Sequence, residues 1–507
     1  MSRRPSVAEQ FHEGTKYRED QSFPPAPDLE AQPSPYKDFH CERPIDLVPD
    51  LPFERFPLGP APYQEPRDAA LLPPLVGRLS RVLFHTYGVT GVQEVPGGHH
   101  LFRAAPSAGA LYPAELYVVP GPDSGLEEGL YDYAVHRHQL VPVFEGPFFD
   151  EVARASFSTP AFEAADALIL LTGVFRRSSW RYHDRAYRRI LLDCGHVLGN
   201  LSLAARAEGW RVAPTPAFED GALSRLLFLD EREEGLLVVA PLVPESAVDA
   251  GGALLGPVRR SPATSGVVPV GESLLHAIHR SSRIERDEPV YAPEAPEWPP
   301  EEEQECQPPV PLGPTHPGLG GSFSETVIQR RSTRAFTGET VPREALARIL
   351  DHGHRAASPG PVRLLQAPEQ LAVHLIVLRV PGLTPGVYRY LPDTHEVLLV
   401  RSGDFHREIG HCALGQGLAS EAAAVVVHSA DLRAAIDAYG DRAYRYLHLD
   451  AGVIGQYLNL AAVDLGVGVS GIAGFFDDSV NRLLRLPESH AILYLTTLGS
   501  PAPFSES

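Results

Sequence analysis

The feature that most constrains the fold is an internal repeat. The segment YHDRAYRRILLDCGHVLGNLSLAARAEG at 182–209 matches YGDRAYRYLHLDAGVIGQYLNLAAVDLG at 439–466, and the two are offset by 257 residues. About half of the aligned positions are identical, and the same offset places Phe218 on Phe475. A match that keeps one offset over so long a stretch indicates a duplication, so both copies have to form the same unit.

Each copy contains the same predicted order of elements. A helix near 75–88 in the first copy, and near 343–356 in the second, precedes a strand and a short strand pair. An apolar strand, a long amphipathic helix that starts at the DRAYR box, and a final apolar strand follow. This order predicts an α+β unit in each half.

Prolines mark where the copies are separated. The chain has 50 of them, about twice the usual share. They concentrate at 22–74 and at 287–317, where no helix or strand period survives. The predicted organisation is a proline-rich arm at 1–60, a first domain at 61–245, a helix and acidic proline-rich linker at 246–320, and a second domain at 321–507.

Composition and charge restrict the class of protein. Of 507 residues, 43% are hydrophobic and 21% are charged, which suits packed domains and excludes a fibrous or wholly disordered chain. The 44 basic and 64 acidic residues leave a net charge of −20, so we expect no nucleic-acid partner. The sequence contains neither a long apolar run nor an N-terminal signal segment, so we expect no membrane span and a cytoplasmic location.

We predict no catalytic metal. The four cysteines lie far apart and form no CxxC pair, which fits a reducing compartment and argues against both disulfides and a cysteine metal site. The histidines do not show metal-binding spacing, and no HExxH motif occurs.

Four motifs lie in the two copies or beside them: FHEGTK at 11–16, PSAGALYPAELYVV at 106–119, the paired YxDRAYR boxes, and RRSTRAF at 330–336. Together they resemble the nitroreductase-like flavoprotein superfamily, and within it the SagB-type thiazole/oxazole dehydrogenase branch. The resemblance implies two tandem nitroreductase-like domains, each a mainly antiparallel sheet flanked by helices, that pair within one chain as a pseudo-dimer. It also implies FMN between the halves, because members of the superfamily bind FMN at their dimer interface.

The resemblance assigns the phosphate side of FMN to the RRSTR motif. Arg330, Arg331 and Arg334 would donate to the phosphate dianion near a helix start, and Ser332 would add a hydroxyl. The alternative interpretation is a cluster of surface arginines that caps a helix.

Two loops would approach the flavin ring, one from each copy. In the first copy, Pro106, Ser107, Ala108 and Gly109 have small side chains that would let backbone N–H groups reach the ring. An ordinary turn before a strand is the alternative.

In the second copy, the resemblance implies that the SGIAGF loop offers backbone donors to flavin N5 and O4. The residues concerned are Gly471, Ile472, Ala473 and Gly474. Many nitroreductases have Pro and Glu where this chain has Gly471 and Ala473, which weakens the expectation of NAD(P)H-linked chemistry.

The copies have lost complementary motifs. The position of RRSTR in the first copy reads YQEPR at 63–67 and keeps only Arg67. The position of PSAGALYP in the second copy reads PGPVRLLQAPEQ, about ten residues shorter. One hybrid site is therefore complete, and we expect a single FMN in a monomeric pseudo-dimer whose linker replaces dimer association.

The residues just before the DRAYR box are candidates for catalysis. The resembled oxidase branch has a Lys-Tyr pair there, whereas this chain has Arg181 and Tyr182. Because arginine stays protonated, Arg181 could only polarise the substrate or bind an anion. Tyr182 would shuttle a proton if Arg181 lowers its pKa, and a structural tyrosine is the alternative.

The DRAYR arginines have a different predicted role. Arg185, Arg188, Arg442 and Arg445 are kept in both copies although the RRSTR motif is not. We therefore predict that they form salt bridges at the interface between the halves.

The predicted function is an FMN-dependent dehydrogenase or oxidase acting on a heterocycle or amino-acid-derived biosynthetic substrate. The substrate would be a small molecule or peptide-derived, and the arm and linker could dock a protein partner of a biosynthetic complex. Two alternatives stay open: an NAD(P)H-dependent nitro- or quinone reductase, and a non-catalytic flavin-binding or scaffold protein.

Overall fold

The computed structural model describes residues 4–21, 27–39, 41, 43–47, 75–95, 98–122, 124–215, 217–247, 258–262, 268–285, 308–313, 319–354, 361–365 and 370–503. The YQEPR segment with Arg67 and most of the acidic linker lie outside these residues.

Each half forms a seven-stranded sheet in the described residues, and the strands follow the same order in both. Neighbouring strands pair antiparallel. The first sheet has the order β1 (Ile45–Asp46), β6 (Gln139–Glu145), β5 (Gly129–Ala134), β4 (Ala114–Pro120), β7 (Ala167–Val174), β9 (Glu234–Pro244) and β8 (Trp210–Val212). The second has the order β10 (Val310–Pro311), β13 (Glu396–Ser402), β12 (Gly386–Leu391), β11 (Ala372–Val377), β14 (Ala424–Asp431), β16 (His490–Gly499) and β15 (Gly468–Ile472).

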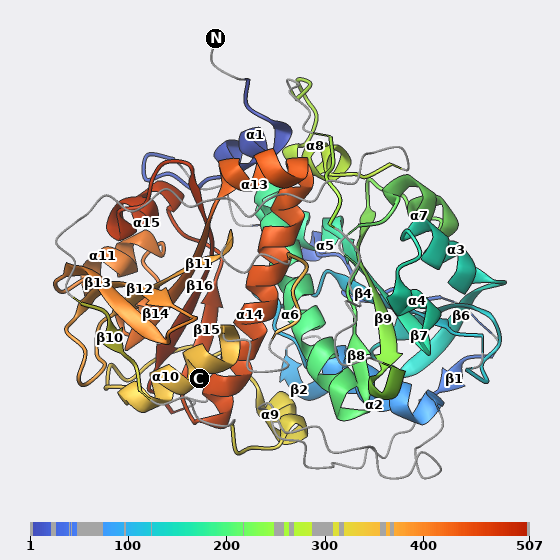
Figure 1. Cartoon of the computed structure of the whole chain (residues 1–507), viewed down its shortest axis with the longest axis horizontal. Helices are drawn as coiled ribbons and strands as arrows, with labels where there is room; N and C mark the ends of the chain where they lie inside the picture. The colour runs from blue at the N-terminus through green and yellow to red at the C-terminus, as the bar shows by residue number, and fades with distance from the viewer. Residues whose placement is uncertain are drawn as a thin grey trace.

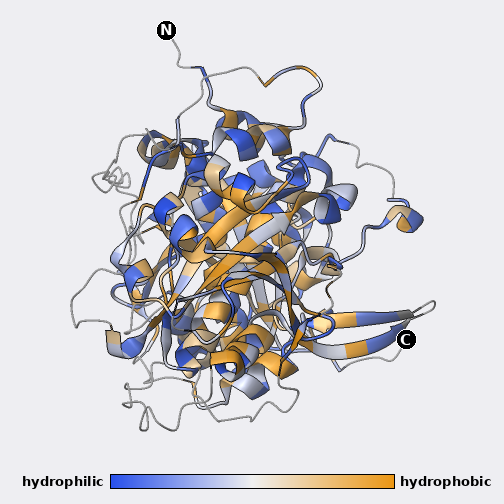
Figure 2. Ribbon diagram, turned by 90° about the vertical axis from the view of Figure 1, so that its right-hand side faces the viewer, coloured by the Kyte–Doolittle hydropathy of each residue, from blue (hydrophilic) through white to orange (hydrophobic). Residues whose placement is uncertain are grey.

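Helices cover both sheets, and the strands beneath them are mostly hydrophobic (Figure 2). The central strands β7 and β14 are buried because apolar residues run through them without alternation. This mixture of sheets and helices confirms the predicted α+β class. The shorter helices are α2 (Leu75–Tyr87), α3 (Phe148–Ala155), α4 (Pro160–Glu163), α5 (Phe175–Tyr182), α7 (Asp220–Leu226), α9 (Phe323–Gln329), α10 (Arg343–His354), α11 (His406–Cys412), α12 (Gly417–Ser420), α13 (Leu432–Tyr439) and α15 (Asp477–Leu484).

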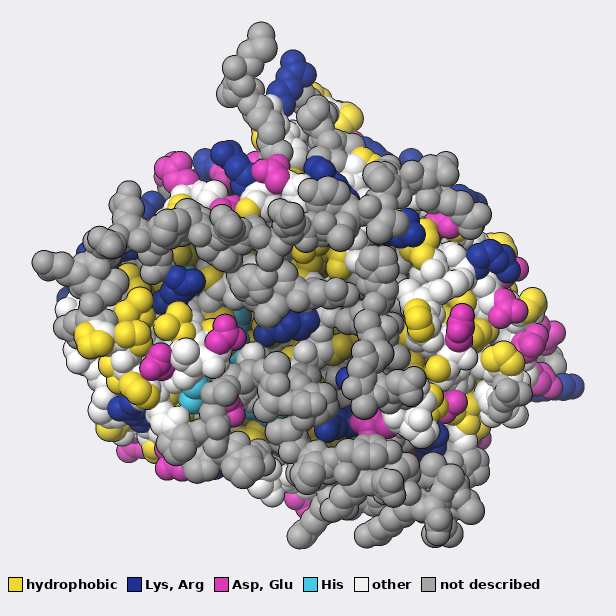
Figure 3. Space-filling model, in the orientation of Figure 1, with side chains coloured by type: hydrophobic (Ala, Val, Ile, Leu, Met, Phe, Trp, Pro, Cys, Tyr) yellow, Lys and Arg dark blue, Asp and Glu magenta, His cyan; other side chains and the backbone are white. Residues whose placement is uncertain are grey.

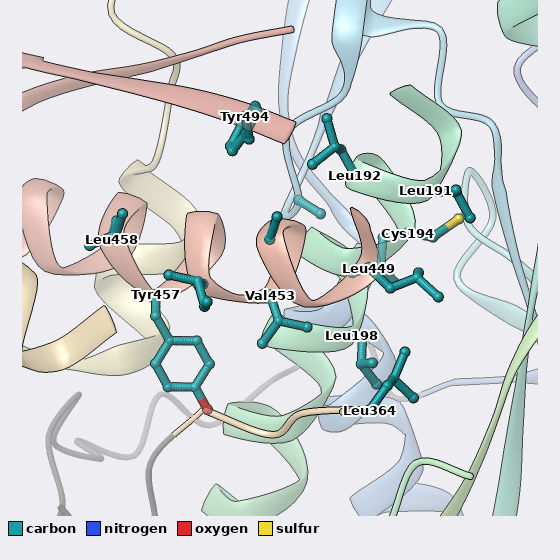
Figure 4. Packing of buried hydrophobic residues seen from close by; sticks show 14 of the residues in the cluster. Leu191, Leu192, Cys194, Leu198, Leu364, Leu449, Val453, Tyr457, Leu458 and Tyr494 are labelled. Atoms are coloured by element: carbon teal, nitrogen blue, oxygen red, sulfur yellow. The ribbon is translucent and has the colours of Figure 1, made fainter. Parts of the chain in front are cut away.

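Two long helices, α6 (Ala186–Ala207) and α14 (Ala443–Asp464), lie side by side between the sheets (Figure 1). They cross at Gly195 and Gly452, where a β-carbon on either glycine would overlap a backbone carbonyl of the facing helix. Leucine, valine and tyrosine side chains of both helices fill the rest of this interface (Figure 4). Because the repeat relates the two helices, one chain forms the predicted pseudo-dimer.

Each DRAYR box binds an aspartate of the opposite half. Asp477 accepts from Arg185 and Arg188 at 2.7 and 2.6 Å. Asp220 accepts in the same way from both arginines of the second box, at 2.6 and 2.7 Å. These buried ion pairs confirm the prediction that the repeated arginines join the halves.

Helix α8 (Leu274–Ser281) repeats the N-terminal helix α1 (Val7–Gly14). Thr15 Oγ1, after α1, accepts from Arg188 at 2.8 Å, and Ser282 Oγ, after α8, accepts from an arginine of the second box at 2.6 Å. The predicted arm and the predicted linker segment therefore each contribute a repeated helix. The domain boundaries themselves stay a prediction.

One element of the first half has no counterpart in the described part of the second. Strands β2 (Val89–Val95) and β3 (Gly98–Arg103) form a hairpin that projects from the body of the protein (Figure 2). It follows α2 directly, so it separates that helix from the PSAGALYP loop.

Candidate functional site

Arg330 joins the RRSTR motif of the second half to the first half. It caps the C-terminal end of α9, so the expectation that it lies near a helix start is wrong. Its Nε and Nη2 donate to the carbonyl oxygens of Ala104 and Arg103 at 2.8 and 3.0 Å. Its Nη1 is buried without a hydrogen-bond partner, and burial lowers the pKa of the guanidinium to about 10. One donor therefore remains for a ligand.

The rest of the motif follows the hairpin and strand β15. Arg331 donates to a carbonyl oxygen of β2 at 2.9 Å. Thr333 Oγ1 accepts from Val469 N, also at 2.9 Å, and so ties the motif to the start of β15. Ser332 is half-buried and Arg334 is exposed. The motif thus runs from the buried interface to the surface.

Helix α6 holds the loop at 106–109. Asp193 accepts from Ser107 Oγ at 2.6 Å and from Ala108 N at 3.1 Å. Gly109 has a φ of +65°, a left-handed conformation that favours glycine. Burial raises the pKa of Asp193 to about 7. Sequence reasoning missed this aspartate, although its repetition at the same offset was a usable signal.

Asp450 occupies the equivalent place in α14, where it accepts from Leu364 N and Leu365 N at 2.8 and 3.0 Å. Leucines therefore stand where the first copy has Ser107 and Ala108. This equivalence keeps the offset of 257, so the expected shortening does not fall within the loop. It lies upstream, where the first copy alone has the β2–β3 hairpin among the described residues.

Tyr182, at the end of α5, lies against the first-half loop. A β-carbon on Gly109 would lie 2.6 Å from its hydroxyl oxygen. The guanidinium carbon of Arg189 lies 3.8 Å from the centroid of its ring, whereas that of the exposed Arg181 lies 5.6 Å away. Burial raises the pKa of Tyr182, and both arginines only partly oppose this. The condition for proton shuttling, a pKa lowered by Arg181, is therefore not met.

The second-half loop is partly strand. Gly471 and Ile472 lie in β15, and Ala473 and Gly474 follow its end. The hydroxyl of Tyr494 packs against Gly471, where any side chain would overlap it. The glycine is therefore required by packing, whatever else its backbone contacts.

Arg189 connects the two loops, and sequence reasoning missed it. Its guanidinium covers the ring of Tyr182, and a β-carbon on Gly474 would lie 3.4 Å from its Nη2. The side chain is only 6% exposed, and its Nη1 is buried without a hydrogen-bond partner. The repeat places Tyr446 at the same position of the second copy, and this difference between the copies was the available signal.

These parts form what we term the open site: the loops 106–109 and 471–474 with Tyr182, Arg189 and Arg330. Two buried guanidinium nitrogens are unpaired, and the hydroxyls of Tyr182 and Tyr494 pack directly against Gly109 and Gly471. Buried cationic donors beside glycine-lined backbone suit a planar ligand that carries negative charge.

The equivalent position in the other copy, which we term the closed site, is covered by chain. Tyr439, the counterpart of Tyr182, is buried, and its hydroxyl accepts from Gln370 Nε2 at 3.2 Å. Ser261 N donates to Tyr439 O at 3.2 Å, which seats the segment 258–262 over this position. Tyr182 is half-buried instead.

Other kinds of site find little support in the described residues. No group of three or more His, Cys, Asp or Glu side chains among them could hold a metal ion. No helix in this part of the chain has the length and apolarity that crossing a membrane requires. On the face shown in Figure 3, acidic and basic side chains are interspersed over the described surface.

Comparison with known proteins agrees with this architecture. The family model described as Nitroreductase family matches twice, at 79–242 and 327–500. A crystal structure of a protein from Anabaena variabilis classed as a nitroreductase is 36% identical with a TM-score of 0.85, covering 98% of this chain and 100% of that one.

Shorter relatives match one part of the chain. A Methanocaldococcus jannaschii protein classed as a nitroreductase is 31% identical over 165 residues, which are 32% of this chain and 80% of that protein. The trifolitoxin-processing protein TfxB of Rhizobium leguminosarum bv. trifolii is 33% identical over 147 residues, which are 26% of this chain and 37% of TfxB. Since the family model covers both sheets and their helices, the chain belongs to the nitroreductase family.

Proposed function

We propose that the chain binds one FMN in the open site and uses it to oxidise a substrate. Arg330, Arg331, Ser332 and Arg334 would hold the phosphate side, and the two loops would contact the ring. The observation that carries the proposal is the asymmetry between the copies. The open site has unpaired buried donors and small residues, whereas the closed site has leucines in the loop and a covering segment.

FMN would supply the redox centre, and the protein would supply orientation and proton transfer. Burial raises the pKa of Tyr182, so its hydroxyl stays protonated at neutral pH and would orient the substrate as a hydrogen-bond donor. Arg181 is exposed at the end of α5, where it would bind an anionic part of the substrate at the entrance.

The likeness to the trifolitoxin-processing protein supports a peptide-derived or amino-acid-derived substrate. We therefore infer a SagB-type dehydrogenase or oxidase that acts on a heterocycle of such origin, with a protein partner of a biosynthetic complex. Of the four cysteines, the three among the described residues (Cys41, Cys194 and Cys412) are free, as a cytoplasmic location would require. The buried ion pairs between the halves support a monomer.

The test is the amount of flavin in the purified chain. We expect visible flavin absorbance and one FMN released per polypeptide on denaturation. Two FMN per polypeptide would contradict the single open site, and protein purified without flavin that does not take up added FMN would favour the scaffold alternative.

A nicotinamide-dependent reductase remains the second candidate, favoured by the likeness to the Anabaena protein. Anaerobic addition of NADH or NADPH separates the two functions. Rapid bleaching of the flavin would favour the reductase, whereas slow or absent bleaching is the result that the dehydrogenase proposal expects.

A further inference from the structure

The unexplained charge of the open site is Arg189. Three arginines, Arg185, Arg188 and Arg189, lie at the N-terminal end of α6 and are all buried. Asp477 binds the first two. Among the described residues, no carboxylate lies within ion-pair distance of the third, whose Nη1 also lacks any hydrogen-bond partner. A buried cation without a counter-charge is costly, so an anionic ligand would stabilise this position.

Asp193 does not supply that counter-charge. It lies one helical turn further along α6, but its carboxylate is held by Ser107 Oγ and Ala108 N. The charge of Arg189 lowers the pKa of Asp193, but burial outweighs it and raises that pKa to about 7. Arg189 therefore has a carboxylate nearby but forms no ion pair with it, and its guanidinium lies over the ring of Tyr182.

The RRSTR motif, which would hold the phosphate side of FMN, is anchored at the opposite end of β15 from Arg189. The RRSTR motif is bonded to the start of β15 through Val469, whereas Arg189 lies against Gly474, beyond the end of that strand. The three residues from Val469 to the end of β15 at Ile472 rise roughly 10 Å, and Gly474 lies two residues further on. The two sets of guanidinium donors thus serve different ends of the open site.

The other copy shows that this cation belongs to the open site. Tyr446 replaces Arg189 there, and its hydroxyl donates to the carbonyl oxygen of Arg259 at 3.4 Å, in the segment that covers the closed site. In the closed site, where the covering segment fills this position, a tyrosine stands in place of the arginine. Where the position is open, a buried guanidinium lies beside the candidate catalytic tyrosine.

We propose that Arg189 binds a carboxylate of the substrate and so places the substrate beside Tyr182. The substrate class is then a carboxylate-bearing molecule that lies on the Tyr182 side of the open site. The inference rests on the proposed function, because it names what that site takes. A guanidinium binds a carboxylate through parallel hydrogen bonds, which fixes orientation as well as affinity.

The test is calorimetric titration of the purified holoprotein with benzoate, and with benzamide as its uncharged analogue. We expect benzoate to bind and benzamide to bind much more weakly. R189Q should weaken benzoate binding by about tenfold or more, since it removes one partner of a buried charge pair. R189K should give an intermediate affinity, because it keeps the charge without the planar donors. R176Q, which removes an exposed arginine of α5, is the matched control and should bind as the wild type does.

Three results would overturn the proposal. These are equal affinity for benzoate and benzamide, unchanged benzoate affinity in R189Q, or loss of flavin from both Arg189 variants, which would assign the residue to the cofactor. Failure of the proposed function is a separate result. Wild-type protein without flavin would refute the flavin site, while the benzoate titration of that same protein would still report on Arg189.

Discussion

Asp477 and Arg188 form an ion pair between the two halves, with 2.6 Å between Oδ1 and Nη1. Burial alone would raise the pKa of Asp477, but the charges of Arg185 and Arg188 outweigh it and lower that pKa. The pKa of its counterpart Asp220 is lowered in the same way by the charges of the two arginines in the second box. Each copy of the repeat therefore recognises the other through one carboxylate that faces two guanidinium groups.

Removing one of these carboxylates should destabilise the pseudo-dimer. D477N leaves two buried arginines without a counter-charge, so we expect the free energy of unfolding to fall by about 3–5 kcal/mol in urea titration. D220N is the matched control, and its free energy of unfolding should fall by a similar amount. Only D477N should also lower the flavin content, because Arg185 contacts the carbonyl oxygen of Ala473 in the open site at 3.5 Å. Equal flavin content in the two variants would contradict this assignment.

The sequence predicted this interface because the arginines sit in a local, repeated box. Their partners were not predicted, since Asp477 lies 289 residues from Arg188, although Asp220 and Asp477 repeat at the offset of 257 residues. The direction of the Tyr182 pKa was missed for a related reason. Adjacent charge is visible in a sequence, whereas desolvation depends on what the folded chain places around the group. The segment 258–262, which covers the closed site, lies within the region 246–320 that was predicted to be a helix and a linker, so its role was not predicted.

The crossing of α6 and α14 should tolerate no side chain at its centre. A β-carbon at Gly195 would overlap a backbone carbonyl of α14, which cannot move aside as a side chain could. We expect G195A to lower the free energy of unfolding by about 1–3 kcal/mol, as overpacking does.

G199A is the control on the same helix. Its β-carbon would lie 3.0 Å from Gln456 Cβ and 3.2 Å from Val453 O. This contact is tight but milder than the overlap with Leu449 O at Gly195. Thermal unfolding of both variants compares them. A larger loss in G199A than in G195A would show that the helices do not cross at Gly195.

Arg330 should be needed for cofactor binding in addition to packing. R330Q removes the unpaired Nη1 donor together with the bonds to Ala104 O and Arg103 O, so we expect FMN affinity to fall by about tenfold or more. Fluorescence titration of the flavin-free protein measures this affinity. R407Q, which changes an exposed arginine of α11, should bind FMN as the wild type does. Wild-type affinity in R330Q would remove the residue from the proposed site.

The two loop-holding aspartates should give the protein a characteristic pH dependence. Burial raises the pKa of Asp193 to about 7 and that of Asp450 to about 6. An aspartate with a raised pKa keeps its proton in the folded state after the unfolded chain has released it. Its contribution to stability is complete below the unfolded pKa of about 4 and is lost as pH rises through the folded pKa.

Substituting each aspartate should remove its part of that dependence. The wild type should lose stability between about pH 4 and 7, whereas D193N lacks this loss. We therefore expect the free energy of unfolding of D193N, relative to that of the wild type, to rise by up to about 1.4 kcal/mol per pH unit in this range. The corresponding rise for D450N should level off near pH 6, one unit earlier, because the pKa of Asp450 in the folded protein is lower than that of Asp193. Urea unfolding of the three proteins from pH 4 to 8 measures both differences, and the buried histidines cancel because all three proteins share them. A D193N difference that does not change with pH would show that Asp193 is ionised when it holds Ser107 and Ala108.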